Sequence, residues 1–377
     1  MSANGEMTQP VAAQSTKDAP TKDTPATAEF TKTGPVKKEK RTARSFLDVL
    51  ITDRMWLLAG LIVVLIVATT IADAAGVLVA PFTVRYLSVS LIALVPLALL
   101  ALAETFVILS GRSGIDLSVG GLVSISGMFF GSLVVDRSMS VVLAAIITLV
   151  FATVLGALNG YLVGFLGFPP LIATLATGYA FSSIALVMHD GAPYSDPTLT
   201  TLNGLTSGMG PGVLAIPWHV VTVLLPVGVL AWMALSKMRW GRAQYAVGTS
   251  DSAARYSAIN QKLTRASAYA VAGLLSGIAA LVNVAQFASA RPDAGTAGNG
   301  LALPAITIAV LGGVAIAGGV GKIGGALMAA LFVTWMNAII LITFPGSFGS
   351  RVQLLALGLV LIGAVLLNQV AAKRRAP

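Results

Sequence analysis

The sequence GRAQYAVGTSDSAARYSAINQKLTR, residues 241–265, lies between two long apolar runs and decides how the rest of the chain is arranged. It carries four basic residues against a single acid, Asp251. A polar segment of this length in an otherwise apolar chain has to lie outside the lipid, and its basic excess indicates the cytoplasmic side of a membrane. We therefore expect a cytoplasmic loop over 237–265, with membrane spans on both sides of it.

Inside this loop the sequence predicts a short helix. Ser250 or Asp251 can cap its first turn, and Gly248 breaks the chain just before it. The helix is expected to run through Arg255 to about Ile259. Its small residues would let another surface come close, so we predict that this helix docks onto a partner that supplies energy.

The composition restricts the class of protein. Apolar residues make up 56% of the 377 residues and charged residues 10%, and the mean hydropathy is +0.86. Soluble domains are about one quarter charged, so an all-α polytopic membrane protein fits best. The net charge of +9 is concentrated in the N-terminal tail, the central loop and the C-terminal end, which indicates membrane orientation and not nucleic-acid binding. The absence of cysteine excludes disulfides, and two histidines exclude a histidine-rich metal site.

Apolar runs predict ten spans and three regions. Residues 1–54 form a polar, disordered cytoplasmic tail, 55–370 form the transmembrane domain, and 371–377 form a basic cytoplasmic tail. Because the number of spans is even, the C-terminus is expected on the same side as the N-terminus. Six of the ten spans precede the central loop, so the loop is expected on that side as well. The predicted spans are 55–72, 88–110, 119–135, 140–166, 170–188, 218–236, 266–288, 303–318, 324–344 and 351–370.

Glycine and proline patterns inside the spans predict close packing and broken helices. Four-residue glycine rows, at 156–164 and 273–277, favour tight helix pairs. Proline within apolar segments indicates irregular backbone that is buried or lines a wet path. Two Gly-rich inner turns, 114–121 and 318–325, are consistent with an inverted repeat.

Several polar residues fall inside or beside apolar segments, where polar groups are expensive and are candidates for the translocation path. Glu104 lies within a span, and a hydrogen-bonding role is favoured over a proton relay because no second buried acid is apparent. Asp116 is expected to cap the following helix near the path. The path candidates are Glu104, Asp116, Ser118, Asn159 and Asn337.

No enzyme active site is recognisable. Residues 319–324 spell G-x-G-x-x-G, but no strand precedes them and no acid follows about 20 residues later, and Ile323 rules out a P-loop. The chain therefore holds no cofactor of its own, and if ATP drives it, a different polypeptide binds the ATP.

Four blocks of sequence together resemble the permease subunits of ribose-type ABC sugar importers. The blocks are ETFVILS (104–110) with GIDLSVG (114–120), Asn159-Gly160 with PPLIATL (169–175), the loop 241–260, and 292–325 with VLGG at 310–313. The resemblance covers about residues 55–370. It implies a type II importer fold in the bacterial inner membrane, with both termini cytoplasmic.

The resemblance also implies the partners. They are a cytoplasmic ABC ATPase subunit, a periplasmic sugar-binding protein and a second permease subunit, expected to be a second copy. The residues expected at the ATPase interface are Asp251, Ala253, Ala254, Arg255, Ile259 and Asn260. Departures from the family pattern are Ala258 in place of a glycine, regarded as mild on a helix, Ala302 in place of an acid, and the added Arg112. These departures leave the identity of the sugar undetermined, but not the class of transporter.

Two alternatives remain at this stage. A stand-alone secondary carrier would use Glu104 for protons, and a membrane scaffold or receptor would transport nothing. The carrier lacks the polar pairs that proton relays show, and the scaffold leaves the broken helices unexplained.

Overall fold

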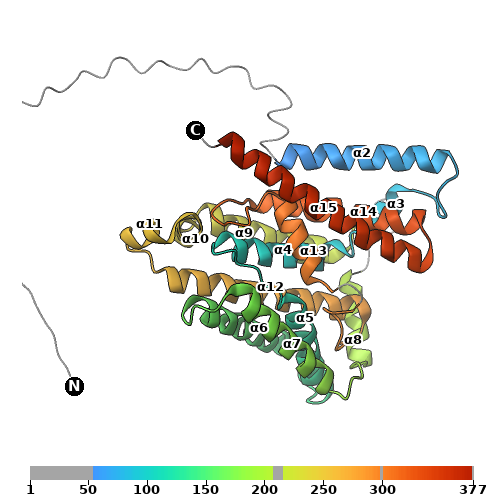
Figure 1. Ribbon diagram of the computed structural model, residues 1–377. Coiled ribbons are helices and arrows are strands. Elements are labelled where there is room, and N and C mark those ends of the chain that lie inside the picture. Colours follow the sequence, from blue (N-terminus) through green and yellow to red (C-terminus); the bar gives the residue numbers. More distant parts are fainter. Residues whose placement is uncertain (1–53, 207–214, 298–299, 376–377) are drawn as a thin grey trace, which may run out of the picture. The chain divides into compact units, whose positions relative to one another are not determined.

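The computed structural model describes residues 54–206, 215–297 and 300–375, and the predicted tail 1–54 lies outside them except for Arg54. The described chain is helical, without a β-strand, and Tyr194 and Ala290 form an isolated bridge. Figure 1 shows the helices. Their bounds are α2 Arg54–Ala74, α3 Val84–Ser90, α4 Leu94–Leu109, α5 Val119–Val135, α6 Val141–Gly164, α7 Pro170–Val187, α8 Pro197–Thr201, η1 Leu202–Thr206, η2 Val220–Leu224, α9 Leu225–Ser236, α10 Arg239–Thr249, α11 Asp251–Tyr256, α12 Gln261–Phe287, α13 Ala302–Leu311, α14 Ile323–Thr343 and α15 Gly346–Arg375.

The prediction of an all-α polytopic fold is confirmed, but the count of ten spans is not. Among the described residues, α2, α6, α7, α12, α14 and α15 are long and apolar enough to cross a membrane. Two bent helix pairs, α3 with α4 and η2–α9 with α10, raise the number from 6 to at most 8. Helices α5, of 17 residues, and α13, of 10 residues, are shorter apolar helices. The predicted span 303–318 ends early because Gly312 closes α13 and Gly313 turns the chain with a φ of 92°.

Helix α12 packs closely along α6, and the glycine rows explain how. A Cβ on Gly156 would lie 2.4 Å from the carbonyl oxygen of Tyr269, and one on Gly273 would lie 2.3 Å from that of Ala152. No side chain fits at either position, so the two backbones touch. The predicted packing role of these glycines is confirmed.

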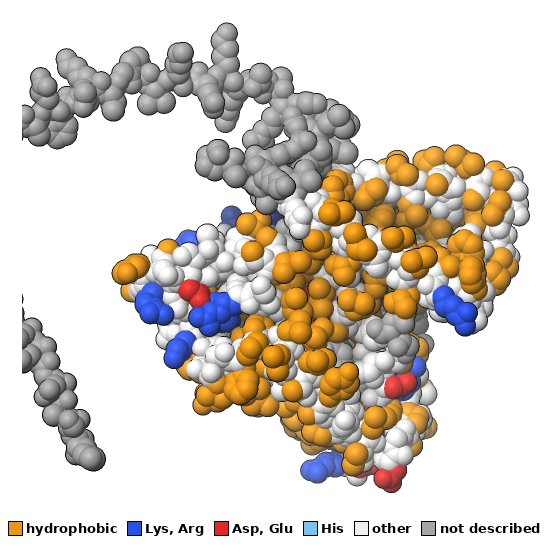
Figure 2. Space-filling view, viewed as in Figure 1, with side chains coloured by type: hydrophobic (Ala, Val, Ile, Leu, Met, Phe, Trp, Pro, Cys, Tyr) orange, Lys and Arg blue, Asp and Glu red, His pale blue; other side chains and the backbone are white. Residues whose placement is uncertain are grey.

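Helix α4 lies at the centre of the fold. Every residue of α4 except Leu97 is buried, and α12, α13 and α14 pack around it. The outer helices α2 and α15 expose apolar side chains such as Trp56 and Leu355, and Figure 2 shows apolar groups spread across this surface. Apolar side chains are stable there when the surrounding solvent is lipid. Helix α15 continues through Arg375, past the predicted boundary at residue 370.

Candidate functional site

The polar loop forms two helices at one end of the fold. Helix α10 leaves α9 at an angle of 66°, and α11 follows after Ser250, whose extended backbone and side chain cap it: the Ser250 Oγ accepts from the Ala253 N–H at 3.3 Å. Of the two predicted caps, Ser250 is therefore the right one. Helix α11 ends at Tyr256 and not near Ile259, because Ala258 has a left-handed backbone with a φ of 57°. Ala258 thus does not lie on a helix, and a glycine would suit this position better.

The predicted interface residues divide into exposed and inward-facing groups. Arg255 and Ala253 are exposed, whereas Ala254 is buried. Asn260 caps the next helix, with its Oδ1 accepting from the Leu263 N–H at 3.1 Å. Sequence reasoning missed Tyr256, whose side chain is 93% exposed beside Arg255. An aromatic residue on a short polar helix was the signal that could have identified it.

Asp251 connects α11 to two other parts of the protein. Its Oδ2 accepts from Arg112 Nε at 2.9 Å and its Oδ1 from Arg265 Nη2 at 2.8 Å. Arg265 is 2% exposed and also donates to the Ser110 carbonyl at 3.3 Å. Partial burial raises the pKa of Asp251, but the hydrogen bond and charge of Arg265, with those of Arg112, outweigh it, so the pKa is lowered.

A junction of glycines connects the same loop to the α4–α5 turn and to the α13–α14 turn. A Cβ on Gly248 would lie 1.9 Å from the Leu109 carbonyl oxygen and 2.4 Å from Gly319 N. One on Gly318 would lie 2.5 Å from Gly111 Cα, and the Gly319 N–H donates to Leu109 at 3.0 Å. The end of α10 therefore touches the α4–α5 turn and the α13–α14 turn without intervening side chains. A displacement of this end of α10 would have to move both turns.

Four of the five predicted path residues form one buried chain of hydrogen bonds. Asn159 Nδ2 donates to Ser118 Oγ at 2.7 Å, and Ser118 Oγ donates to Asp116 Oδ1 at 2.5 Å. The Asp116 N–H donates to Glu104 Oε2 at 3.3 Å. The chain continues from Asn159 Oδ1 to Thr177 Oγ1 at 2.7 Å. Residues far apart in sequence thus meet through α4, α5, α6 and α7.

The structure changes three details of these predictions. Asp116 does not cap α5 in the usual way; it accepts from the Ser118 N–H at 2.9 Å in a local turn. The assumption that Glu104 lacks a second buried acid is wrong, because Asp116 is 0% exposed. Asn337, on α14, does not join this series of hydrogen bonds. Its main-chain carbonyl accepts a hydrogen bond from the Gln353 side chain at 2.9 Å.

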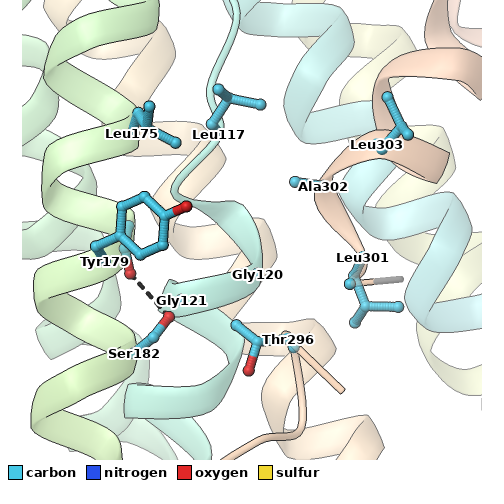
Figure 3. A pocket seen from close by; sticks show the side chains of 13 residues that line it. Leu117, Gly120, Gly121, Leu175, Tyr179, Ser182, Thr296, Leu301, Ala302 and Leu303 are labelled. Carbon is cyan, nitrogen blue, oxygen red and sulfur yellow. Dashed lines mark hydrogen bonds between the residues drawn. The ribbon is translucent and has the colours of Figure 1, made fainter. Parts of the chain in front are cut away.

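A cavity of about 440 Å³ opens next to these hydrogen-bonded residues, between α5, α7 and the start of α13. Figure 3 shows Tyr179 and Ser182 on one wall and Ala302 and Leu303 on the other. The wall also includes Leu117 and the first glycines of α5, so Glu104, Asp116, Ser118 and Asn159 lie behind the wall and do not line it. Whether they act on a solute stays a prediction. Ala302, one of the departures from the family pattern, faces the cavity.

The cavity wall is largely apolar and includes backbone. A Cβ on Gly120 would lie 2.5 Å from the Gly295 carbonyl oxygen, so α5 and the segment before α13 touch there. The side-chain oxygens on the wall belong to Tyr179, Ser182 and Thr296, and Ser182 Oγ donates to the Gly178 carbonyl at 2.8 Å. Among the described residues that line it, none is charged.

Comparison with known proteins identifies the family. The family described as branched-chain amino acid transport system / permease component matches residues 86–368. The chain is 35% identical over 271 residues to the ribose import permease protein RbsC of Bacillus subtilis, covering 72% of this chain and 80% of that protein. It is 31% identical over 275 residues to the D-allose transport system permease protein AlsC of Escherichia coli, covering 73% and 80%.

A further relative is the autoinducer 2 import system permease protein LsrD of Yersinia enterocolitica, 32% identical over 270 residues, with 71% of this chain and 80% of that protein covered. No solved structure matches the chain. These relatives are subunits of ABC importers, so the hypothesis of a stand-alone carrier is not supported. A permease subunit is a transporter and not an enzyme, because the ATPase activity of such importers lies in a separate subunit. The chain belongs to this family of ribose-type ABC import permeases and is a multi-pass protein of the inner membrane.

Proposed function

We propose that this chain carries a monosaccharide, such as ribose or a similar pentose or hexose, through an ABC importer whose ATP is bound by a separate subunit. The observation that carries this proposal is α11: it is exposed at Arg255 and Tyr256, and Asp251 at its start pairs with Arg112 in the α4–α5 turn and with Arg265 on α12. A helix built in this way can receive a force from an ATPase and pass it to the membrane helices.

The interface with the ATPase subunit is proposed to include Arg255 and Tyr256 as the exposed contacts, with Ala253 as a small exposed residue on the same helix. Asp251 holds the helix from behind through Arg112 and Arg265, and Ala254 is buried behind it. Ile259 and Asn260, which caps α12, follow α11 and are proposed to belong to the same interface. Exposed aromatic and arginine side chains are the usual anchors of protein interfaces. A periplasmic sugar-binding protein is proposed to dock on the opposite end.

A neutral solute suits the cavity better than an amino acid does. Its volume of about 440 Å³ lies within the range of small-molecule pockets, about 300–1,000 Å³. Its polar side chains are the hydroxyls of Tyr179, Ser182 and Thr296. An amino acid carries two charges, and burying them without charged partners would be unfavourable. The names of the ribose and allose permeases support a sugar, although the description of the family mentions branched-chain amino acids.

A second copy of the chain is proposed to complete the path. Tyr179 on α7 lines the cavity and is 69% exposed, so one copy leaves this wall open to its surroundings. Both termini are proposed to be cytoplasmic. This placement is supported by Arg54, at the start of α2, which donates to Asn368 near the end of α15 at 2.6 Å and lines a cavity with Tyr245 of α10.

The proposal is tested by reversing the charge of Arg255. The Arg255→Glu variant should lose the ATPase subunit on gentle purification from its native membrane and should lose sugar uptake. Arg137→Glu is the matched control for co-purification of the ATPase, since Arg137 is exposed beyond the C-terminal end of α5, away from α11. If Arg255→Glu retains both the ATPase and uptake, the assignment of α11 is wrong.

The transport path is tested separately at Ala302. A tryptophan at this position would fill part of the cavity, so Ala302→Trp should abolish uptake while the ATPase still co-purifies. Normal uptake of ribose by this variant would exclude the cavity as the path. Competition by unlabelled ribose, allose and leucine identifies the solute class, and competition by leucine alone would contradict a sugar.

A further inference from the structure

The buried carboxyl groups of Glu104 and Asp116 pose an electrostatic problem that the transport function does not explain. Both side chains are 0% exposed, and the Asp116 N–H contacts Glu104 Oε2 at 3.3 Å. Two neighbouring negative charges in an apolar interior repel each other and lose their hydration. Such a pair is stable only if a cation or a proton neutralises part of the charge.

The surrounding elements supply no free cation. On α12, the buried Arg265 is already paired with Asp251 at 2.8 Å, and the other titratable group facing the pair is the Tyr269 phenol. Helices α13 and α14 and the π-helix η2, which also pack against α4, contain no titratable residue, and the buried His219 before η2 contacts the Ile92 carbonyl at 3.2 Å through its Nε2. The basic residues of α10 lie in the polar loop. Within the described chain, the pair therefore lacks a counter-ion.

Three oxygen atoms at this place have no hydrogen-bond partner in the described structure. They are Glu104 Oε1, Asp116 Oδ2 and the Tyr269 hydroxyl, and Tyr269 is 0% exposed. Buried polar atoms without partners are rare, and each calls for a ligand or a proton. The three unpartnered oxygens, from two carboxyls and a phenol, mark a site that binds a positive species.

The hydrogen bonds distinguish the two carboxyls. Asp116 Oδ1 accepts from the Ser118 N–H at 2.9 Å and from the Ser118 hydroxyl at 2.5 Å, and that hydroxyl accepts in turn from Asn159 at 2.7 Å. This series of donors stabilises a carboxylate on Asp116. Glu104 accepts a single, longer bond at 3.3 Å. We propose that the pair is a buried site for one proton, carried by Glu104 as a neutral acid while Asp116 is the carboxylate.

Infrared spectroscopy of the full-length permease in lipid nanodiscs tests this proposal. The wild type at neutral pH should show a carboxylic-acid C=O band that shifts in D₂O. Glu104→Gln should remove this band, Asp116→Asn should keep it, and Asp190→Asn, which removes an exposed acid, should leave it unchanged. Absence of the band from the wild type, or its persistence in Glu104→Gln, would overturn the proposal.

Two further measurements cover folding failure and the rival ligand. If Glu104→Gln does not fold, carboxyl-¹³C labelling of glutamate should shift the wild-type band, and the same label on aspartate should not. The reverse result would place the proton on an aspartate and overturn the assignment. Replacing Na⁺ by choline should not change the unfolding temperature. Stabilisation by Na⁺ that is absent from Glu104→Gln would show that a cation, and not a proton, occupies the site.

Discussion

Replacing Asp251 by asparagine tests whether this side chain holds α11 on the membrane helices. The substitution keeps the size of the side chain and removes its charge. Arg265, which is 2% exposed, then loses the carboxylate at 2.8 Å and keeps the Ser110 carbonyl at 3.3 Å. Arg112 loses the same carboxylate, but its side chain is 55% exposed and water replaces the contact.

The two ion pairs contribute unequally to stability. Removing one partner of a fully buried pair costs about 3–5 kcal/mol, and the Arg265 pair should cost less, about 2–3 kcal/mol, because Asp251 is 27% exposed. The exposed Arg112 pair should contribute less than about 1 kcal/mol. Asp251→Asn should therefore destabilise the permease by about 3 kcal/mol and Arg112→Gln by under about 1 kcal/mol.

Reversible unfolding in mixed detergent micelles measures both variants. The double variant Asp251→Asn, Arg265→Gln should cost less than the sum of the single variants, because it leaves no buried charge without a partner. Equal losses for Asp251→Asn and Arg112→Gln, or strict additivity in the double variant, would refute the account of Asp251 as the partner of a buried charge.

Because the pKa of Asp251 is lowered, the difference in unfolding free energy between the wild type and Asp251→Asn should depend on pH. A carboxyl with a lower pKa in the folded state stabilises the fold above its unfolded pKa, about 3.9 for aspartate, and loses this contribution as the pH falls through the folded pKa. The gap in stability between wild type and Asp251→Asn should thus be constant near neutral pH and shrink only at acidic pH. If the difference in stability narrowed between pH 7 and 9, this would contradict a lowered pKa of Asp251 as its cause.

Three other substitutions test the end of α10 and the segment around α11. Gly248→Ala should prevent folding, because its Cβ would lie 1.9 Å from a carbonyl oxygen. The control is Gly358→Ala on α15, whose Cβ would meet nothing within 4 Å and which should change stability by under about 1 kcal/mol. The yield of folded protein on size-exclusion chromatography compares the two variants. Ala258→Gly should stabilise the fold by about 0.5–1 kcal/mol in the same unfolding assay, because a left-handed alanine is strained, and destabilisation would contradict the backbone assignment. Tyr256→Ala should weaken ATPase binding by about 2 kcal/mol without changing the unfolding midpoint, and unchanged binding would remove Tyr256 from the interface.

The sequence alone determined the class of this protein and the position of its polar loop. Apolar runs near 20 residues have one stable solution in a bilayer, so α2, α6, α7 and α14 were predictable within a few residues, and α12 and α15 within about five. The polar loop was equally clear, because a basic segment of 25 residues cannot be placed in lipid. Local capping signals then located α11 at Ser250, although a left-handed Ala258 shortened it.

Only the tertiary structure decided which distant groups meet. Hydropathy treats an apolar residue beside Gly312 like any other, so it could not show that α13 stops at Leu311. Nothing in the local sequence shows that Glu104 contacts the backbone of Asp116, or that Gly248 touches Leu109 and Gly319. These contacts depend on how α4, α12 and the two turns pack, and packing joins residues whose separation along the chain carries no periodic signal.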